Sequence, residues 1–136
     1  EYRAAWSGGD AARMFRLATD DIHWVNIVGM HWQGRAQAEL AHRIYLETMF
    51  RGVALALEEV ESVVPVGTGA LAVVARWNMG GFTPPDGQTV PPSKDRMSLV
   101  LQRTSDGFRI AHGANVQINQ AVQQFDPVSK SPRPEN

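Results

Sequence analysis

The hydrophobic period of this chain changes near residue 53, and that change most constrains the fold. Apolar and polar residues alternate over residues 53–65 and 70–79, and again over residues 95–104 and 108–118. Within each pair, a short turn containing glycine separates the two runs. A period of two is typical of strands, so the second half of the chain predicts two antiparallel hairpins.

The first half of the chain has a helical period instead. A first helix ends at Gly8, a second is capped by Asp10 and extends to about Ala18, and a third covers residues 36–50. Residues 21–35 predict a strand, a tight turn and a short return strand. Helices followed by strands indicate an α+β fold. We expect a cone-shaped roll, in which a curved, mostly antiparallel sheet and three helices of the N-terminal half enclose a pocket.

The length of 136 residues fits one domain. We expect this domain to cover residues 1–122, and the proline-containing residues 123–136 to form an extended or disordered arm. The net charge is -1 without a basic run, which excludes nucleic-acid binding driven by phosphate contacts. The chain has no cysteine, so disulfides and thiolate chemistry are excluded as well.

No stretch of the sequence approaches the ~18 to 20 apolar residues of a membrane span. The sequence therefore predicts no membrane partner, and we expect a cytoplasmic location. The chain starts at Glu1 without a methionine, which leaves open whether a preceding segment, such as a signal peptide, has been removed.

Residues 21–35 bring two tryptophans, two histidines and an asparagine into one short hairpin. Trp24 and Asn26 share a row of the first strand, so a pocket lined by Trp24 is reached by Asn26 too. His23 points to the opposite side, and we expect His23 and His31 at the surface or the rim. This stretch predicts the wall of an apolar cavity with a few polar groups in it.

These residues resemble a known family. The run VNIVGMHWQGR, the helical His42 and the closing GFRIAHGAN are similar to the SnoaL-like proteins of the nuclear transport factor two superfamily, and most of all to the SgcJ/EcaC group. The most specific matches are Asn26, Trp32, Gly34, Arg35, His42 and Asn115. The resemblance implies a cone-shaped α+β fold, a homodimer through the outer sheet face and a cavity for small organic molecules. Polyketide cyclases and ketosteroid isomerases belong to the same superfamily.

The resemblance also implies a difference from ketosteroid isomerase. Tyr2 falls where that enzyme keeps the tyrosine of its oxyanion hole, but its general-base aspartate falls on Asn26. An amide has no usable proton affinity near pH 7 and cannot abstract a proton. The second oxyanion donor falls near Leu99, which donates nothing. We therefore do not expect the standard mechanism of that enzyme.

Two histidines are the candidate catalytic residues, His42 on the long helix and His112 on the last strand. An imidazole with a pKa near 6.5 suits proton transfer, although a core histidine with one internal hydrogen bond is the alternative for each. His112 shares a row with Ile110, and Asn115 falls on the opposite row unless a bulge intervenes, so one of the two must face away from the pocket. The candidate ligand-binding residues are Tyr2, Trp24, Asn26, Trp32, Trp77 and Asn115.

We predict no metal and no cofactor, because the four histidines form no metal-binding pair and nucleotide-binding loops are missing. The predicted function is that of a small-molecule pocket protein, acting as a cofactor-independent isomerase or cyclase on an apolar carbonyl compound. The predicted partners are a small apolar organic ligand and a second copy of the chain. The alternative is a ligand-binding or dimerisation module without chemistry.

Overall fold

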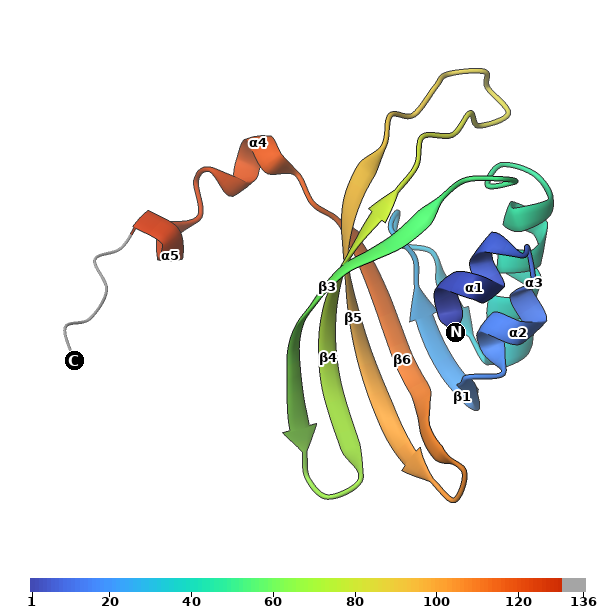
Figure 1. The fold of residues 1–136 in the computed structure, drawn as a ribbon, viewed down its shortest axis with the longest axis vertical. Coiled ribbons are helices and arrows are strands. Elements are labelled where there is room, and N and C mark those ends of the chain that lie inside the picture. Colours follow the sequence, from blue (N-terminus) through green and yellow to red (C-terminus); the bar gives the residue numbers. More distant parts are fainter. Residues whose placement is uncertain (131–136) are drawn as a thin grey trace.

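A curved sheet packed against three helices forms the body of the protein (Figure 1). The computed structural model describes residues 1–130. Its elements, in chain order, are α1 (Tyr2–Ser7), α2 (Ala11–Phe15), β1 (Ala18–Val25), β2 (His31–Gln33), α3 (Arg35–Glu47), β3 (Leu55–Val66), β4 (Ala70–Met79), β5 (Ser93–Thr104), β6 (Gly107–Gln117), α4 (Gln120–Gln123) and α5 (Pro127–Lys130).

The sheet has six strands in the order β2-β1-β6-β5-β4-β3. Strands β3 to β6 form the two predicted antiparallel hairpins, and β4 also pairs with β5. Strand β1 runs parallel to β6 and antiparallel to β2, so the sheet is mixed and stays open at its β2 and β3 edges. The predicted α+β class is confirmed, and α1, α2 and α3 all cover one face of the sheet (Figure 1).

Helix α2 is shorter than the sequence predicts. The Asp10 side chain caps it by accepting a hydrogen bond from the Arg13 backbone N–H at 2.9 Å, as expected of an N-cap aspartate. The helix ends at Phe15 rather than near Ala18, because Ala18 already pairs with Ile110 of β6. The apolar spacing of Ala18 fits a helix, but the sheet partner decides its conformation.

The loop between β1 and β2 is held by one side chain. The Asn26 Oδ1 accepts hydrogen bonds from the backbone N–H groups of Val28 at 3.2 Å and Met30 at 2.8 Å. Gly29 in this loop has a φ of 85°, which favours glycine. The return strand then places Trp32 opposite Trp24 across the two strands. Both tryptophans thus lie on one face of the hairpin.

The core lies between the helices and the inner face of the sheet, which we define as the face that carries Trp24. Phe15 and Ile22 are fully buried there, and Trp24 is 2% exposed. Gly113 of β6 lies directly under Trp24, and a Cβ at this position would come within 2.5 Å of the indole. Only a residue without a side chain leaves the space that this indole fills.

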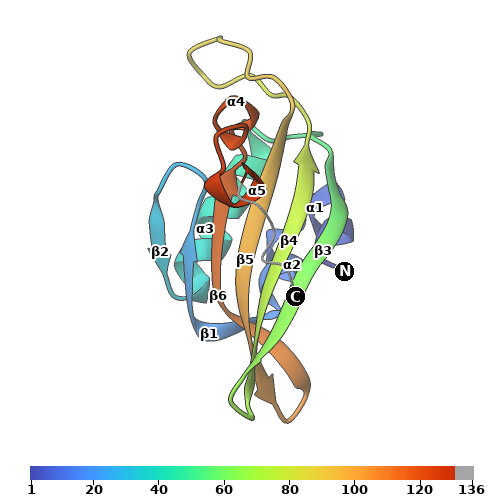
Figure 2. The ribbon, with the colours of Figure 1, turned by 90° about the vertical axis from the view of Figure 1, so that its left-hand side faces the viewer.

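The C-terminal arm leaves the body on the outer side of the sheet, opposite α1 to α3 (Figures 1 and 2). Its described part carries α4 and α5. The side chain of Asn119 accepts a hydrogen bond at the start of α4, and Asp126 accepts one from the Val128 backbone N–H beside Pro127. The rest of the predicted arm, residues 131–136, lies outside the described residues.

Among residues 1–130, the structure has no helix that is both long and apolar enough to cross a membrane. The cytoplasmic location and the domain limit at residue 122 stay predictions.

Candidate functional site

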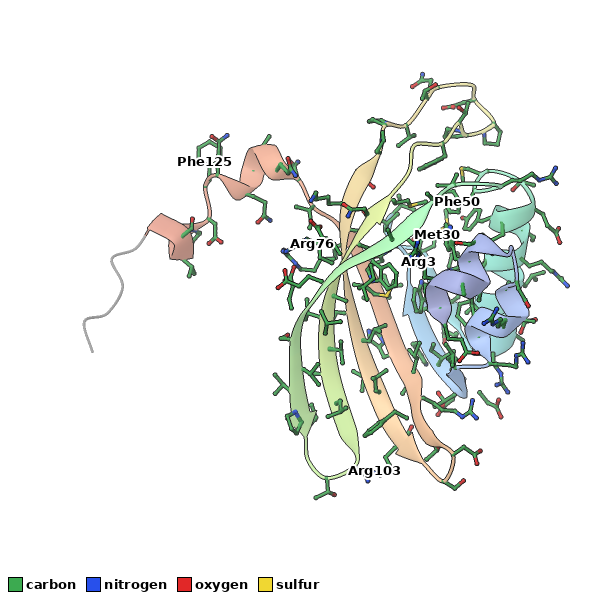
Figure 3. The ribbon with its side chains drawn as sticks, viewed as in Figure 1. Arg3, Met30, Phe50, Arg76, Arg103 and Phe125 are labelled. Carbon is green, nitrogen blue, oxygen red and sulfur yellow. The ribbon has the colours of Figure 1, made fainter. Side chains whose placement is uncertain are left out.

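A cavity of about 190 Å³ lies between the helices and the inner face of the sheet. Side chains from α1, the β1–β2 hairpin, α3 and strands β3 to β6 line it. Two of them, Met30 and Phe50, are labelled in Figure 3 between the upper part of the sheet and the helices. The structure brings seven of the eight predicted site residues to this cavity: Tyr2, Trp24, Asn26, Trp32, His42, Trp77 and Asn115.

His42 is buried at the helix side of the cavity, with 7% of its surface exposed. Its Nδ1 lies 2.8 Å from the Ala38 carbonyl oxygen, which can only accept, so Nδ1 carries the proton. Three aromatic rings surround the imidazole, with centroid distances of 4.8 Å to Phe15, 5.6 Å to Trp24 and 5.4 Å to Trp32. Burial lowers the pKa of His42 from 6.5 to about 4. The ring is therefore neutral near pH 7, and Nε2 is a hydrogen-bond acceptor and a weak base.

The sheet side of the cavity carries polar atoms without partners. Among residues 1–130, four buried side-chain N or O atoms make no hydrogen bond, and three of them belong to residues that line this cavity: Trp77 Nε1, Asp95 Oδ2 and Asn115 Oδ1. By contrast, the Nε1 of Trp6, which also lines the cavity, donates to the Val53 carbonyl oxygen at 2.8 Å. Buried polar groups are normally paired, so a concentration of unpaired ones at one cavity indicates a ligand.

Asp95 is the site residue that the sequence analysis missed. It is 1% exposed, and its Oδ1 accepts a hydrogen bond from the Ser93 hydroxyl at 3.1 Å. Burial raises the pKa of Asp95, which favours the protonated carboxyl group. The signal for it is the alternating row of Asp95, Met97 and Leu99 on one strand, of which the resemblance marks only Leu99.

Tyr2 projects from α1 onto the same aromatic wall. Its ring stacks on Trp24 with a centroid distance of 6.4 Å and an interplanar angle of 17°, and its centroid lies 5.8 Å from that of Trp77. Burial raises the pKa of the Tyr2 hydroxyl well above its ordinary value, so the hydroxyl stays a neutral donor. Asn26 also lines the cavity, but its Oδ1 already holds the β1–β2 loop.

A β-bulge decides between His112 and Asn115. Val100 pairs with His112 while the next residue of β5 pairs with Ile110, so Ala111 is an extra residue in β6. The row predicted through Ile110 and His112 is therefore broken, and Gly113 faces Trp24. His112 lies on the outer face and does not line the cavity, whereas Asn115 does.

His23 and His31 are exposed, as expected, and a hydrogen bond of 2.9 Å joins the Nδ1 of His23 to the Nε2 of His31. In the described part of the chain, no group of three or more His, Asp or Glu side chains is placed to hold a metal ion. The absence of a cofactor stays a prediction.

A wider and more open hollow of about 690 Å³ lies at the root of the C-terminal arm, beside Gln117 and Ile118. None of the four unpaired buried atoms of residues 1–130 belongs to a residue that lines it. The smaller cavity is therefore the candidate site.

Comparison with known proteins gives a family match and several similar structures. The family model described as a SnoaL-like domain matches residues 1–117. An uncharacterized protein with a cystatin-like fold from Caulobacter vibrioides is 30% identical, with a TM-score of 0.90 over 96% of this chain and 91% of that chain. No curated protein sequence matches the chain.

Two further structures share the fold. A ketosteroid isomerase-like protein from Erwinia carotovora atroseptica is 18% identical, with a TM-score of 0.68 over 87% of this chain and 88% of that one. A nuclear transport factor 2-like superfamily protein from Salmonella enterica is 19% identical, with a TM-score of 0.70 over 96% of this chain and 89% of that one. The family match covers nearly the whole body of the structure, and the chain belongs to the SnoaL-like domain family.

Proposed function

We propose that this protein binds a small, apolar, carbonyl-bearing molecule in the 190 Å³ cavity and isomerises or cyclises it without a cofactor. The observation that carries the proposal is the set of unpaired buried atoms at one apolar cavity, Trp77 Nε1, Asp95 Oδ2 and Asn115 Oδ1. A ligand carbonyl oxygen would accept from the Trp77 N–H and from a protonated Asp95 carboxyl, and a donor on the ligand would pair with the Asn115 oxygen.

The donors lie together on one side of the cavity. Tyr2 contacts Trp77, and Trp77 pairs with Asp95 across β4 and β5. The Tyr2 hydroxyl and the Asp95 carboxyl, whose protonated form burial favours, would donate hydrogen bonds to the carbonyl oxygen of the ligand. These bonds strengthen as that oxygen becomes an enolate, so they stabilise the transition state more than the ground state.

His42 would act as the base from the other side of Trp24. The carbon–hydrogen bond beside the carbonyl breaks, its proton goes to His42 Nε2, and the electron pair forms the enolate. Return of the proton to the far carbon of a neighbouring C=C bond shifts that double bond and completes an isomerisation. Alternatively, attack of the enolate carbon on a second carbonyl closes a ring, and the resulting alkoxide takes the proton from His42. A base whose pKa is about 4 is weak, so proton removal depends on the donors at the enolate oxygen.

Exchange of ketone α-protons with deuterated water, followed by NMR, tests this chemistry. We expect His42→Ala to lower the exchange rate about 10²- to 10⁴-fold, because general-base catalysis contributes on that order. His23→Ala is the matched control, since His23 is an exposed histidine of β1 that does not line the cavity, and it should exchange at the wild-type rate. Equal rates for wild type and His42→Ala would remove His42 as the base.

Binding without chemistry is the second candidate function, because the same unpaired atoms would serve it. Ligand-dependent increases in the melting temperature without proton exchange would favour a binding module. We also propose that the protein belongs to the SgcJ/EcaC group, and hence acts in natural-product metabolism, because Asn26, Trp32, His42 and Asn115 match that group.

The predicted homodimer has support on the outer face of the sheet. Val64 and Val66 share this face with Arg76 by strand register, and they are 54% and 53% exposed. An apolar surface of this kind fits a second copy of the chain. Sedimentation of wild type should give twice the mass of the chain, and Val64→Glu should lower it to one chain; a wild-type monomer would contradict the dimer.

A further inference from the structure

The cavity constrains its ligand by size. An apolar cavity of about 150 Å³ in a protein core is filled by one benzene molecule. The cavity here measures about 190 Å³, which leaves room for one ring and a few substituent atoms. Val28 and Met30 are 71% and 48% exposed, so the opening lies at the β1–β2 loop. A fused four-ring skeleton exceeds this volume and would have to project through the opening.

The walls constrain the ligand by shape. Seven aromatic residues line the cavity besides His42: Tyr2, Trp6, Trp24, Trp32, Tyr45, Phe50 and Trp77. Aromatic rings attract other flat rings through stacked and edge-to-face contacts worth about 0.5–1.5 kcal/mol per pair. A planar ring therefore uses these walls better than a saturated one of the same volume.

The lining also constrains the ligand by charge. It includes neither lysine nor arginine, and its titratable residues are Tyr2, His42, Tyr45 and Asp95. Burial keeps His42 neutral and raises the pKa values of Tyr2 and Asp95. A carboxylate or phenolate ligand would lose its hydration without meeting a cation, which disfavours it strongly.

The unpaired atoms constrain the ligand by hydrogen bonding. The indole N–H of Trp77 can only donate, whereas the Oδ1 of Asn115 can only accept. A ligand that satisfies both needs an acceptor and a donor. A ring with a carbonyl group and a hydroxyl group has both.

Building on the proposed function, we propose that the ligand of this cavity is a neutral, planar, single-ring hydroxyaryl ketone. Its carbonyl oxygen accepts from the donors around Trp77 and Asp95, its hydroxyl donates to Asn115, and its ring lies among the aromatic walls. This class is smaller than steroids and multi-ring polyketides.

Calorimetric titration with four probes tests the class: 4-hydroxyacetophenone, acetophenone, 4-acetylbenzoate and androstenedione. We expect 4-hydroxyacetophenone to bind at least about tenfold more tightly than acetophenone, which lacks the hydroxyl donor, because a site built for hydrogen bonds rejects analogues that leave its groups unpaired. The charged 4-acetylbenzoate and the four-ring androstenedione should bind at least about a hundredfold more weakly.

Two variants locate the binding. Trp77→Phe keeps the aromatic wall and removes the N–H, and it should weaken 4-hydroxyacetophenone binding about tenfold. Thr19→Val is the matched control, because the Thr19 hydroxyl is the fourth unpaired buried atom of the described chain and Thr19 does not line this cavity. It should leave the affinity unchanged.

The outcomes separate this inference from the function on which it rests. Tight binding of androstenedione that Trp77→Phe weakens would overturn the single-ring class and leave the carbonyl-binding cavity standing. Stronger binding of 4-acetylbenzoate than of 4-hydroxyacetophenone would overturn the neutral class in the same way. No binding of any of the four probes would overturn both the class and the proposed function.

Discussion

Polar side chains are paired on the outer face of the sheet and unpaired on the inner face, although residues of the two faces alternate along the same strands. On the outer face, Arg76 bonds to Glu58, Glu59 and Glu61 at 2.7 to 2.8 Å. Its neighbour Trp77 points to the inner face and leaves its N–H unpaired. Figure 3 shows Arg76 on the side of the sheet away from the helices.

The same contrast recurs on β5. Lys94 bonds to Glu58 at 2.8 Å and Arg96 to Glu61 at 3.0 Å, whereas Asp95 between them is buried with one oxygen unpaired. Paired charges at the surface contribute little to stability, because water screens them. Unpaired buried polar groups lower the stability of the fold. Their presence on the inner face is therefore better explained by ligand binding than by folding.

The largest expected effect is a fall in the free energy of unfolding in acid, caused by protonation of His42. Its folded-state pKa is about 4, below the ordinary 6.5, so the unfolded chain takes up the proton first as the pH falls. The contribution of His42 is therefore complete above pH 6.5 and is lost between pH 6.5 and 4, by about 3 kcal/mol in total. Urea unfolding of wild type and His42→Phe across this range measures it.

Wild type and His42→Phe must be compared because protonation of Glu58 and Glu61 also lowers the stability of the protein in acid. Lys94 and Arg96, respectively, are the main causes that hold their pKa values below the ordinary range. That loss occurs at lower pH and is common to both proteins. Parallel pH profiles for wild type and His42→Phe would contradict a buried neutral His42.

Gly113→Ala should have the next largest effect. The new Cβ would lie 2.5 Å from the Trp24 indole, so the ring must move and the free energy of unfolding should fall by about 1–3 kcal/mol. Gly69→Ala is the control, because no heavy atom lies within 4 Å of a Cβ there. Chemical denaturation of both variants tests the packing of the inner face, and equal stabilities would contradict it.

A smaller effect is expected for Asp95→Asn, and it has the opposite sign. Burial raises the pKa of Asp95, so Asp95 lowers the free energy of unfolding once the pH is high enough to ionise it. This destabilisation is absent below the ordinary aspartate pKa and develops as the pH rises through the folded-state value. The neutral amide removes this destabilisation, and stability at pH 7 should rise by on the order of 1 kcal/mol. A loss of stability at every pH would show that the carboxyl group is already well paired.

Arg76→Ala should have the smallest effect. Its ion pairs lie at the surface, so the melting temperature should change by no more than a few degrees, and less at high salt. Ligand affinity should stay at the wild-type value, because Arg76 faces away from the cavity. A tenfold change in affinity would mean that the two faces are coupled.

The sequence predicts much of this fold because most elements have a clear period and clear ends. The two hairpins and α3 follow from alternation and helical spacing, and residues 21–35 form the expected hairpin. The end of α2 could not be predicted, since Ala18 joins the sheet through Ile110, a partner 92 positions away in the chain, counted from 18 to 110.

The site is predictable in part for the same reason. Trp24 and Asn26 reach the cavity from one row of a local hairpin, as alternation predicts. The bulge at Ala111 reverses the faces of His112 and its neighbours, and no local pattern marks it. Asp95 becomes a site residue only when β5 pairs with β4 beside Trp77 and both turn toward Tyr2.

The central claim is that the hydrogen-bond donors of the cavity, Tyr2, Trp77 and Asp95, bind a carbonyl oxygen. The infrared carbonyl stretch of bound 4-hydroxyacetophenone, labelled with ¹³C at the carbonyl, tests this most directly, because hydrogen bonds lower the frequency. We predict a frequency below that in a hydrocarbon solvent for wild type and Arg76→Ala, and a partial return toward the hydrocarbon value in Tyr2→Phe and Asp95→Leu. A hydrocarbon-like frequency in wild type, unchanged by Tyr2→Phe and Asp95→Leu, would contradict the claim.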